Sequence, residues 1–179
     1  MPPSPSQPLL EPRPSALDLD TFVAHYGNIF EHSPWVAEAA WQQGLNTEHD
    51  HPDRLAELMG HMLQQASSDE QIKVIRAHPD LAGKAALAGE LTGDSTREQA
   101  GAGLDQCSPE ELERFERLNA AYQQKFGFPF VIAVKGLDRH AILNAFAERI
   151  DNDLATERQT AVEQIIRIAR LRLRARADG

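Results

Sequence analysis

The residue whose type and position best suit proton transfer is His78, which directly precedes Pro79. A proline disfavours helical backbone in the residue before it, so an upstream helix must end there and leave the imidazole at an edge. Histidine ordinarily titrates near neutral pH and can both take up and release a proton. A histidine at a helix end is also commonly a cap or a solvated residue, and these interpretations of His78 stay open.

Ser95 and Glu98 form a second candidate group. Their spacing is that of a capping box, in which a serine at the helix start and a glutamate three residues later satisfy backbone N–H groups. On spacing alone the capping box is the simpler interpretation. It is compatible with a place in a ligand site, because the open N–H groups of a helix N-terminus also attract anions.

The last helix that the sequence predicts carries one arginine among its apolar residues. A rotation of about 100° per residue places Arg172 on the apolar face, whereas Arg167, Arg170 and Arg174 project away from it. A buried arginine needs an anionic partner, which can be a structural carboxylate or a ligand. Both alternatives stay open for Arg172.

Metal and nucleotide chemistry find little support in the sequence. His49, Asp50 and His51 are neighbours in an expected loop, and no HExxH pattern is present. Motifs for phosphate cradles and for serine-hydrolase elbows are also absent. The single cysteine, Cys107, cannot form an intramolecular disulfide, which indicates a reducing compartment. The sequence therefore gives little support to a metal site and none to a nucleotide cofactor.

Helix signals recur along the chain and must position these residues. Capping residues that open helices are expected at Asp18 or Asp20, at Ser68 with Gln71, at Ser108 with Glu111, at Asp138, and at Thr156 with Gln159. Apolar residues follow these signals at three- and four-residue steps. Only residues 130–134 look like a strand, and one strand has no partner here. The sequence predicts an all-α fold, a single domain of about eight helices over residues 16–179.

Composition excludes several partners. The chain has 179 residues, which suits one domain, and its net charge of -9 argues against general attraction to nucleic acid or to an anionic membrane. The longest apolar run, residues 126–134, is too short to span a bilayer. Prolines are dense in residues 1–14, so residues 1–15 are expected to be a flexible Pro-rich tail. The N-terminus lacks the features of a secretory signal, and we expect a cytoplasmic protein.

Five segments of the chain share their order and spacing with a known family. They are FVAHYGNIFEHSPWVAEAAW (22–41), HPDLAGK (78–84), LTGDSTREQAGAGL (91–104), LNAAYQQKFGFPFVIAVKG (118–136) and IRIARLRL (166–173). Together they resemble the 2-oxo-4-hydroxy-4-carboxy-5-ureidoimidazoline (OHCU) decarboxylases, which complete the pathway from uric acid to (S)-allantoin. The resemblance covers residues 17–174, and the combination of HPDLAG, SxxEQ and FGFPFVIAVKG is specific.

This resemblance implies an all-helical homodimer that acts on a small anionic substrate without a cofactor. It implies that His78 is the catalytic residue, that Pro79 lines the substrate and that Glu98 is the second candidate for proton handling. The implied substrate contacts are Ser95, Glu98 and Gln99, the residues Phe130, Val131, Ile132, Ala133 and Val134 chiefly through their backbone groups, and Arg172 as an anion-binding residue.

Two other functions stay open. The first is a hydrolase acting on the preceding hydroxyisourate, although that family carries different motifs and a β-rich fold. The second is a helical protein-interaction module, in which the arginine-rich last helix would bind an acidic partner.

Overall fold

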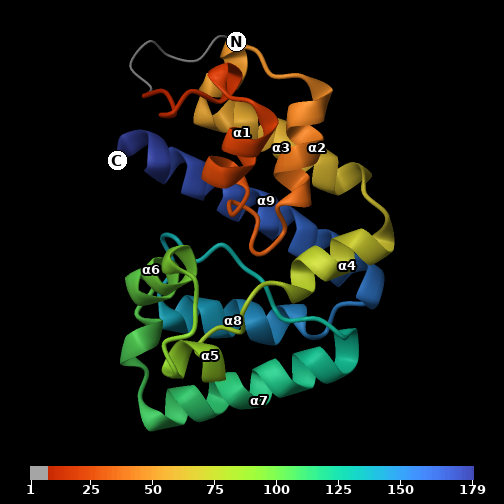
Figure 1. Ribbon diagram of the computed structural model, residues 1–179. Helices are drawn as coiled ribbons and strands as arrows, with labels where there is room; N and C mark the ends of the chain where they lie inside the picture. Colours follow the sequence, from red (N-terminus) through yellow and green to blue (C-terminus); the bar gives the residue numbers. More distant parts are fainter. Residues whose placement is uncertain (1–7) are drawn as a thin grey trace. The chain divides into compact units, whose positions relative to one another are not determined.

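The computed structural model describes residues 8–179, which form helices and loops without a β-strand (Figure 1). The helices are α1 (Leu19–Tyr26), α2 (Trp35–Gln43), α3 (Pro52–Gln65), α4 (Ser68–Arg76), α5 (Lys84–Leu87), α6 (Gly93–Gly101), α7 (Pro109–Phe126), α8 (Arg139–Arg149) and α9 (Leu154–Asp178). Short 3-10 helices are η1 (Pro14–Ala16), η2 (Thr47–Asp50) and η3 (Leu104–Gln106). The predicted all-α class of about eight helices is confirmed. In the same residues, no helix combines the length and the apolar character that crossing a membrane requires.

The chain divides into two compact units. Unit 1 comprises the described residues up to Val74 together with Ile165–Gly179, and unit 2 comprises Ile75–Gln164. The boundaries fall inside α4 and α9, and the predicted domain over residues 16–179 includes both units.

Helices α1, α2 and α3 and the C-terminal part of α9 supply the core of unit 1. Phe22, Leu55 and Met59 have no exposed surface. Gly60 of α3 marks a close approach, because a Cβ at this position would lie 2.8 Å from Cγ2 of Ile166. The absence of a side chain at Gly60 therefore lets α3 pack tightly against α9 within this unit.

Residues 8–15 pack against the rest of unit 1, which the proline pattern did not predict. Leu10 is fully buried, and its N–H donates to the carbonyl of Asp50 at 2.8 Å. Ser15 donates from its backbone and its hydroxyl to the two carboxylate oxygens of Asp50, at 2.9 and 2.8 Å. Residues 1–7 of the predicted tail lie outside the described residues.

An aromatic cluster around Tyr122 of α7 forms the core of unit 2. The Tyr122 ring lies 4.5 Å from Phe126, 5.5 Å from Phe130 and 5.7 Å from Phe146, measured between ring centroids. The helix itself begins with the predicted capping box of Ser108 and ends at Gly127, whose left-handed φ of 79° suits glycine. Residues 130–134 follow as a segment without regular secondary structure, so the strand-like pattern of the sequence does not form a strand there.

Several helices begin at other residues than the sequence predicts. At α4 the hydroxyl of Ser67, and not that of Ser68, accepts the N–H of the residue three positions later, at 3.2 Å. At α9 the carboxylate of Asp153 accepts the N–H of Thr156 at 2.7 Å, so Thr156 lies inside the helix. The two candidates are adjacent at α4 and three positions apart at α9. In each case more than one side chain is able to cap, and the packing of the helix decides which one does.

Candidate functional site

His78 lies directly after α4, where the sequence predicts the helix to end. Its N–H still donates to the carbonyl of Ile75 at 3.1 Å, and Pro79 prevents a further helical turn. The residue is 7% exposed, so it is a buried histidine and not a solvated one. A buried imidazole beside a fixed backbone is suited to proton transfer with a bound molecule.

Two buried amide side chains hold the segment that follows His78. Gln99 of α6 accepts the N–H of Ala82 at 3.0 Å and donates to the carbonyl of Asp80 at 3.3 Å. Asn119 of α7 donates to the carbonyl of Leu81 at 3.0 Å. Because both amides are shielded from water, these hydrogen bonds fix the backbone of residues 80–82 against α6 and α7.

The same segment adopts a backbone conformation that few sequences tolerate. Ala82 has a left-handed φ of 51°, which is uncommon for a residue with a side chain. At Gly83 a Cβ would lie 2.7 Å from Cβ of Asp80, so glycine is required. The carboxylate of Asp80 in turn accepts a hydrogen bond from Gln123 at 2.9 Å. The shape of this turn therefore depends on several specific residues.

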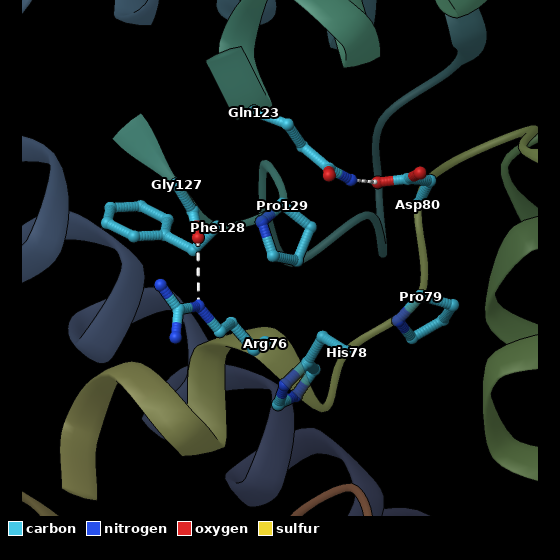
Figure 2. A pocket seen from close by; sticks show the side chains of 8 residues that line it. All are labelled: Arg76, His78, Pro79, Asp80, Gln123, Gly127, Phe128 and Pro129. Carbon is cyan, nitrogen blue, oxygen red and sulfur yellow. Dashed lines mark hydrogen bonds between the residues drawn. The ribbon is translucent and has the colours of Figure 1, made fainter. Parts of the chain in front are cut away.

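A pocket of about 420 Å³ lies beside this turn (Figure 2). Its lining combines the end of α4, the turn after it and the end of α7, and consists of Arg76, His78, Pro79, Asp80, Gln123, Gly127, Phe128 and Pro129. Of the site residues predicted from the sequence, the pocket therefore contains His78 and Pro79. This volume lies within the range of roughly 300–1,000 Å³ that is usual for pockets that bind small molecules.

Arg76 also lines this pocket, and the sequence reasoning did not single it out. Its Nε donates to the carbonyl of Gly127 at 2.9 Å, and within the described chain it makes no ion pair with a carboxylate (Figure 2). Its positive charge is therefore available to an anion in the pocket. In the sequence it is one cation in the last turn of a helix, where a favourable interaction with the helix dipole already explains it.

The predicted capping box at Ser95 and Glu98 is wrong. Helix α6 begins at Gly93, and the hydroxyl of Thr92 accepts the N–H of Ser95 at 3.2 Å, which places Ser95 inside the first turn. Ser95 and Gln99 are each 5% exposed and Glu98 is half-buried. These three residues share one face of α6 because they are three and four positions apart. They do not line the pocket, although Gln99 contacts its wall through residues 80–82.

The predicted contact segment 130–134 follows the pocket wall formed by residues 127–129. Phe130, Val131, Ala133 and Val134 are buried, and Ile132 is half-buried. Side chains from α8 and α9 contact the backbone of this segment, and none of its five residues lines the 420 Å³ pocket.

Arg172 belongs to unit 1, and its predicted inward placement is confirmed. The residue is 6% exposed, and its Nη1 lies 2.8 Å from the carboxylate of the buried Glu31 and 3.2 Å from the carbonyl of Ile29. The structural carboxylate is thus one partner of Arg172, and a role in anion binding stays a prediction. Arg174 on the same helix pairs with both carboxylate oxygens of Asp53, at 2.7 and 2.8 Å.

Two of the three residues considered for metal binding, His49 and Asp50, have other contacts. Nδ1 of His49 accepts the N–H of Asn46 at 3.1 Å, and Asp50 holds Ser15. Across residues 8–179, no three or more His, Cys, Asp and Glu side chains are grouped so that they could hold a metal ion. At Cys107, burial raises the pKa of the thiol, which reduces its thiolate fraction.

Comparisons with known proteins agree on one family. A family model described as OHCU decarboxylase matches residues 15–174. The 2-oxo-4-hydroxy-4-carboxy-5-ureidoimidazoline decarboxylase of Haloferax volcanii is 42% identical over 160 residues, which is 89% of this chain and 91% of that protein. The Bacillus subtilis uric acid degradation bifunctional protein PucL is 37% identical over 157 residues, covering 88% of this chain and 30% of that protein.

Two solved structures share the fold. An (S)-allantoin synthase aligns with a TM-score of 0.70 and 28% identity over 91% of this chain; the chain spans 52% of that one. An OHCU decarboxylase crystallised in the presence of (S)-allantoin aligns with a TM-score of 0.68 over 84% of this chain and 96% of that one. At 21% identity the second likeness concerns the fold alone. The match over residues 15–174 and the identity to curated relatives show that the chain belongs to the OHCU decarboxylase family.

Proposed function

We propose that this protein decarboxylates 2-oxo-4-hydroxy-4-carboxy-5-ureidoimidazoline to (S)-allantoin in uric acid degradation. The observation that carries the proposal is the 42% identity to the Haloferax volcanii decarboxylase over nearly the full length of both chains. The pocket beside His78 supports it, because it has the size for a small substrate and an arginine whose charge suits an anionic one.

The proposed reaction needs no cofactor, because the substrate contains its own electron acceptor. When the bond between the ring carbon and its carboxylate breaks, carbon dioxide leaves and the electron pair forms a double bond to the neighbouring ring carbon. The C=N bond of that neighbour gives its π electrons to nitrogen, which takes up a proton. Many other decarboxylases use pyridoxal phosphate or a metal for this purpose.

In this proposal His78 moves the protons. It accepts the proton of the hydroxyl on the carbon that has lost carboxylate, which converts the enol to a carbonyl. The neighbouring carbon then receives a proton on one face, and this step sets the S configuration. Histidine suits both directions of transfer. The burial of His78 and the hydrogen bonds that fix residues 80–82 support this role, since both restrict the imidazole to one position.

The other predicted contacts complete the proposal. Glu98 would orient His78 or adjust its charge, and Arg172 would bind an anionic group of the substrate. Ser95, Gln99 and Pro79 would contact the substrate, as would the backbone of residues 130–134. Gln99 already hydrogen-bonds to Asp80 and Ala82 in this structure, so we assign it a second task of holding the turn.

The direct test follows freshly generated substrate by circular dichroism, with and without protein. We expect faster decay of the substrate and a lasting signal of (S)-allantoin. His78→Gln should lower kcat by about 10²- to 10⁴-fold, the usual contribution of a general acid–base group. His140→Gln is the matched control, because His140 is 68% exposed on unit 2 and should retain full activity. Optically pure (S)-allantoin formed at the normal rate by His78→Gln would overturn the role of His78.

The proposal also includes independence from metals, a homodimer and a cytoplasmic location. Exhaustive chelation should leave the activity unchanged, and activity that is lost and then restored by zinc would contradict the cofactor-free reaction. Light scattering coupled to size-exclusion chromatography measures the mass in solution, and we expect twice the mass of one chain.

A further inference from the structure

Segment 130–134 is held by side chains from α8 and from the part of α9 that belongs to unit 2. Nη1 of Arg149, at the end of α8, donates to the carbonyl of Val131 at 2.7 Å. Oε1 of Gln164, on α9, accepts the N–H of Ala133 at 2.9 Å. The segment has no strand partner in the described chain, so these two contacts replace the hydrogen bonds that a neighbouring strand would supply.

Arg149 also holds the aromatic ring at the start of this segment. Its guanidinium carbon lies 4.4 Å from the centroid of the Phe130 ring. The same ring stacks on Phe146 with centroids 4.0 Å apart and planes inclined by 8°. Phe146 and Arg149 are one turn apart on α8, so a single helix end fixes both the Phe130 ring and the Val131 carbonyl.

The position of Arg149 is itself fixed by a buried carboxylate. Nε of Arg149 lies 2.9 Å from Glu157, which has no exposed surface. Glu157 accepts two further hydrogen bonds, from the hydroxyl of Tyr122 at 2.6 Å and from Asn152 at 3.1 Å. The guanidinium is therefore held through contacts that are independent of residues 130–134.

Several backbone N–H groups of segment 130–134 have no hydrogen-bond partner among the described residues. The N–H groups of Val131, Ile132 and Val134 make no hydrogen bond within residues 8–179, although Val131 and Val134 are buried. Buried backbone N–H groups nearly always have a partner. Donors of this kind, fixed in place, suit the carbonyl and ureido oxygens of a small polar substrate.

We infer that Arg149 and Gln164 are positioning residues, which fix segment 130–134 so that its remaining N–H groups bind the substrate. The inference rests on the proposed function for the identity of the substrate. The placement of the segment by these two side chains can be measured separately from activity.

Gln164 provides the sharper test, because it is half-buried and carries no charge. Gln164→Met removes the oxygen that accepts the N–H of Ala133, whereas Gln164→Glu retains an acceptor oxygen on a side chain of the same length. We expect Gln164→Met to lower kcat/KM by tenfold or more, as a displaced binding group does, with an unchanged pH profile. Gln164→Glu should stay within about threefold of the wild type. Gln159→Met, an exposed glutamine on the same helix, is the control and should have wild-type activity.

Hydrogen–deuterium exchange of the peptide that contains residues 130–134 measures the positioning itself. Gln164→Met should exchange there at least several-fold faster, while Gln164→Glu and Gln159→Met should match the wild type. Arg149→Lys should also increase exchange, because an ammonium group cannot bridge Glu157 and the Val131 carbonyl as a guanidinium does.

The outcomes separate the two proposals. An active wild type whose Gln164→Met variant keeps its kcat/KM would overturn the inference and leave the proposed function intact. A wild type without activity on the substrate would contradict the proposed function. In that case hydrogen–deuterium exchange would still test whether Arg149 and Gln164 position segment 130–134. Unchanged exchange in both Gln164→Met and Arg149→Lys would overturn this positioning role.

Discussion

Tyr122→Phe tests whether the buried carboxylate of Glu157 stabilises unit 2. The substitution removes the hydroxyl that donates to Glu157 at 2.6 Å, and neither residue has exposed surface. A hydrogen bond to a charged group contributes roughly 1.5–3 kcal/mol. Glu157 retains Arg149 at 2.9 Å, so its charge stays paired and the larger cost of a stranded buried charge does not apply. We expect the free energy of unfolding to fall by about 2 kcal/mol.

The pH dependence of this effect has a definite sign. Burial, followed by the hydrogen bond to Glu157, raises the pKa of Tyr122 above its ordinary value of 10.0. The unfolded chain therefore releases the phenol proton before the folded chain does. The stabilisation by Tyr122 is fully present below about pH 10 and is lost as the pH rises beyond it. The difference between wild type and Tyr122→Phe should be constant between about pH 7 and 9 and shrink above 10.

Urea unfolding followed by far-ultraviolet circular dichroism is the suitable assay. Both tryptophans, Trp35 and Trp41, belong to unit 1, so fluorescence would report the wrong part of the chain. Tyr26→Phe is the matched control, because Tyr26 is also buried and donates to a neutral acceptor, the carbonyl of Pro12. Tyr26→Phe should lower the free energy of unfolding by about 1 kcal/mol. Equal losses for the two variants, or a loss below about 0.5 kcal/mol for Tyr122→Phe, would refute the reasoning.

Three further predictions concern unit 1 and the start of α4. Ser67→Ala should lower the free energy of unfolding by roughly 0.5–2 kcal/mol, whereas Ser68→Ala should change it by less than about 0.5, because only Ser67 caps the helix. Leu10→Ala should cost about 2–5 kcal/mol in thermal or urea unfolding, since Leu10 is fully buried; a negligible cost would show that residues 8–15 do not pack in solution. At Asp53, the hydrogen bond from Arg174 lowers the pKa of the carboxyl in the folded protein. The ion pair therefore stabilises the fold at pH values above the pKa of Asp53 in the unfolded chain. This stabilisation is lost as the pH falls through the pKa of Asp53 in the folded protein. Both side chains are partly exposed, so Asp53→Asn should cost less than about 1 kcal/mol at neutral pH and nothing in strong acid, as acid titration of the two proteins would measure.

The fold was predictable because its helices carry local signals. Capping residues, prolines and apolar stripes lie within a few residues of the helix ends that they specify, as at Asp18, Ser108 and Asp138. The errors arose where more than one nearby side chain could cap the same helix. Ser67 and Ser68 are chemically identical, and only the packing of α4 distinguishes them.

The site was predictable only in part, because its supporting contacts join distant parts of the chain. His78 could be predicted as a candidate because it directly precedes a proline. The contact of Ala133 with Gln164 joins residues 31 positions apart, and that of Tyr122 with Glu157 spans 35. No local pattern contains such pairs. Asn119 did leave a signal, since it is a polar residue inside the apolar stripe of α7, where a buried amide must have a partner.

The turn after His78 is held by the side-chain amides of Gln99 and Asn119, and this affects how the reaction rate depends on pH. Side-chain amides neither gain nor lose a proton over the range in which a histidine titrates. The hydrogen bonds from Gln99 and Asn119 to residues 80–82 therefore keep their strength from mildly acidic to mildly alkaline solution. A curve of rate against pH should consequently report the groups that transfer protons, undistorted by any loosening of the backbone that carries them.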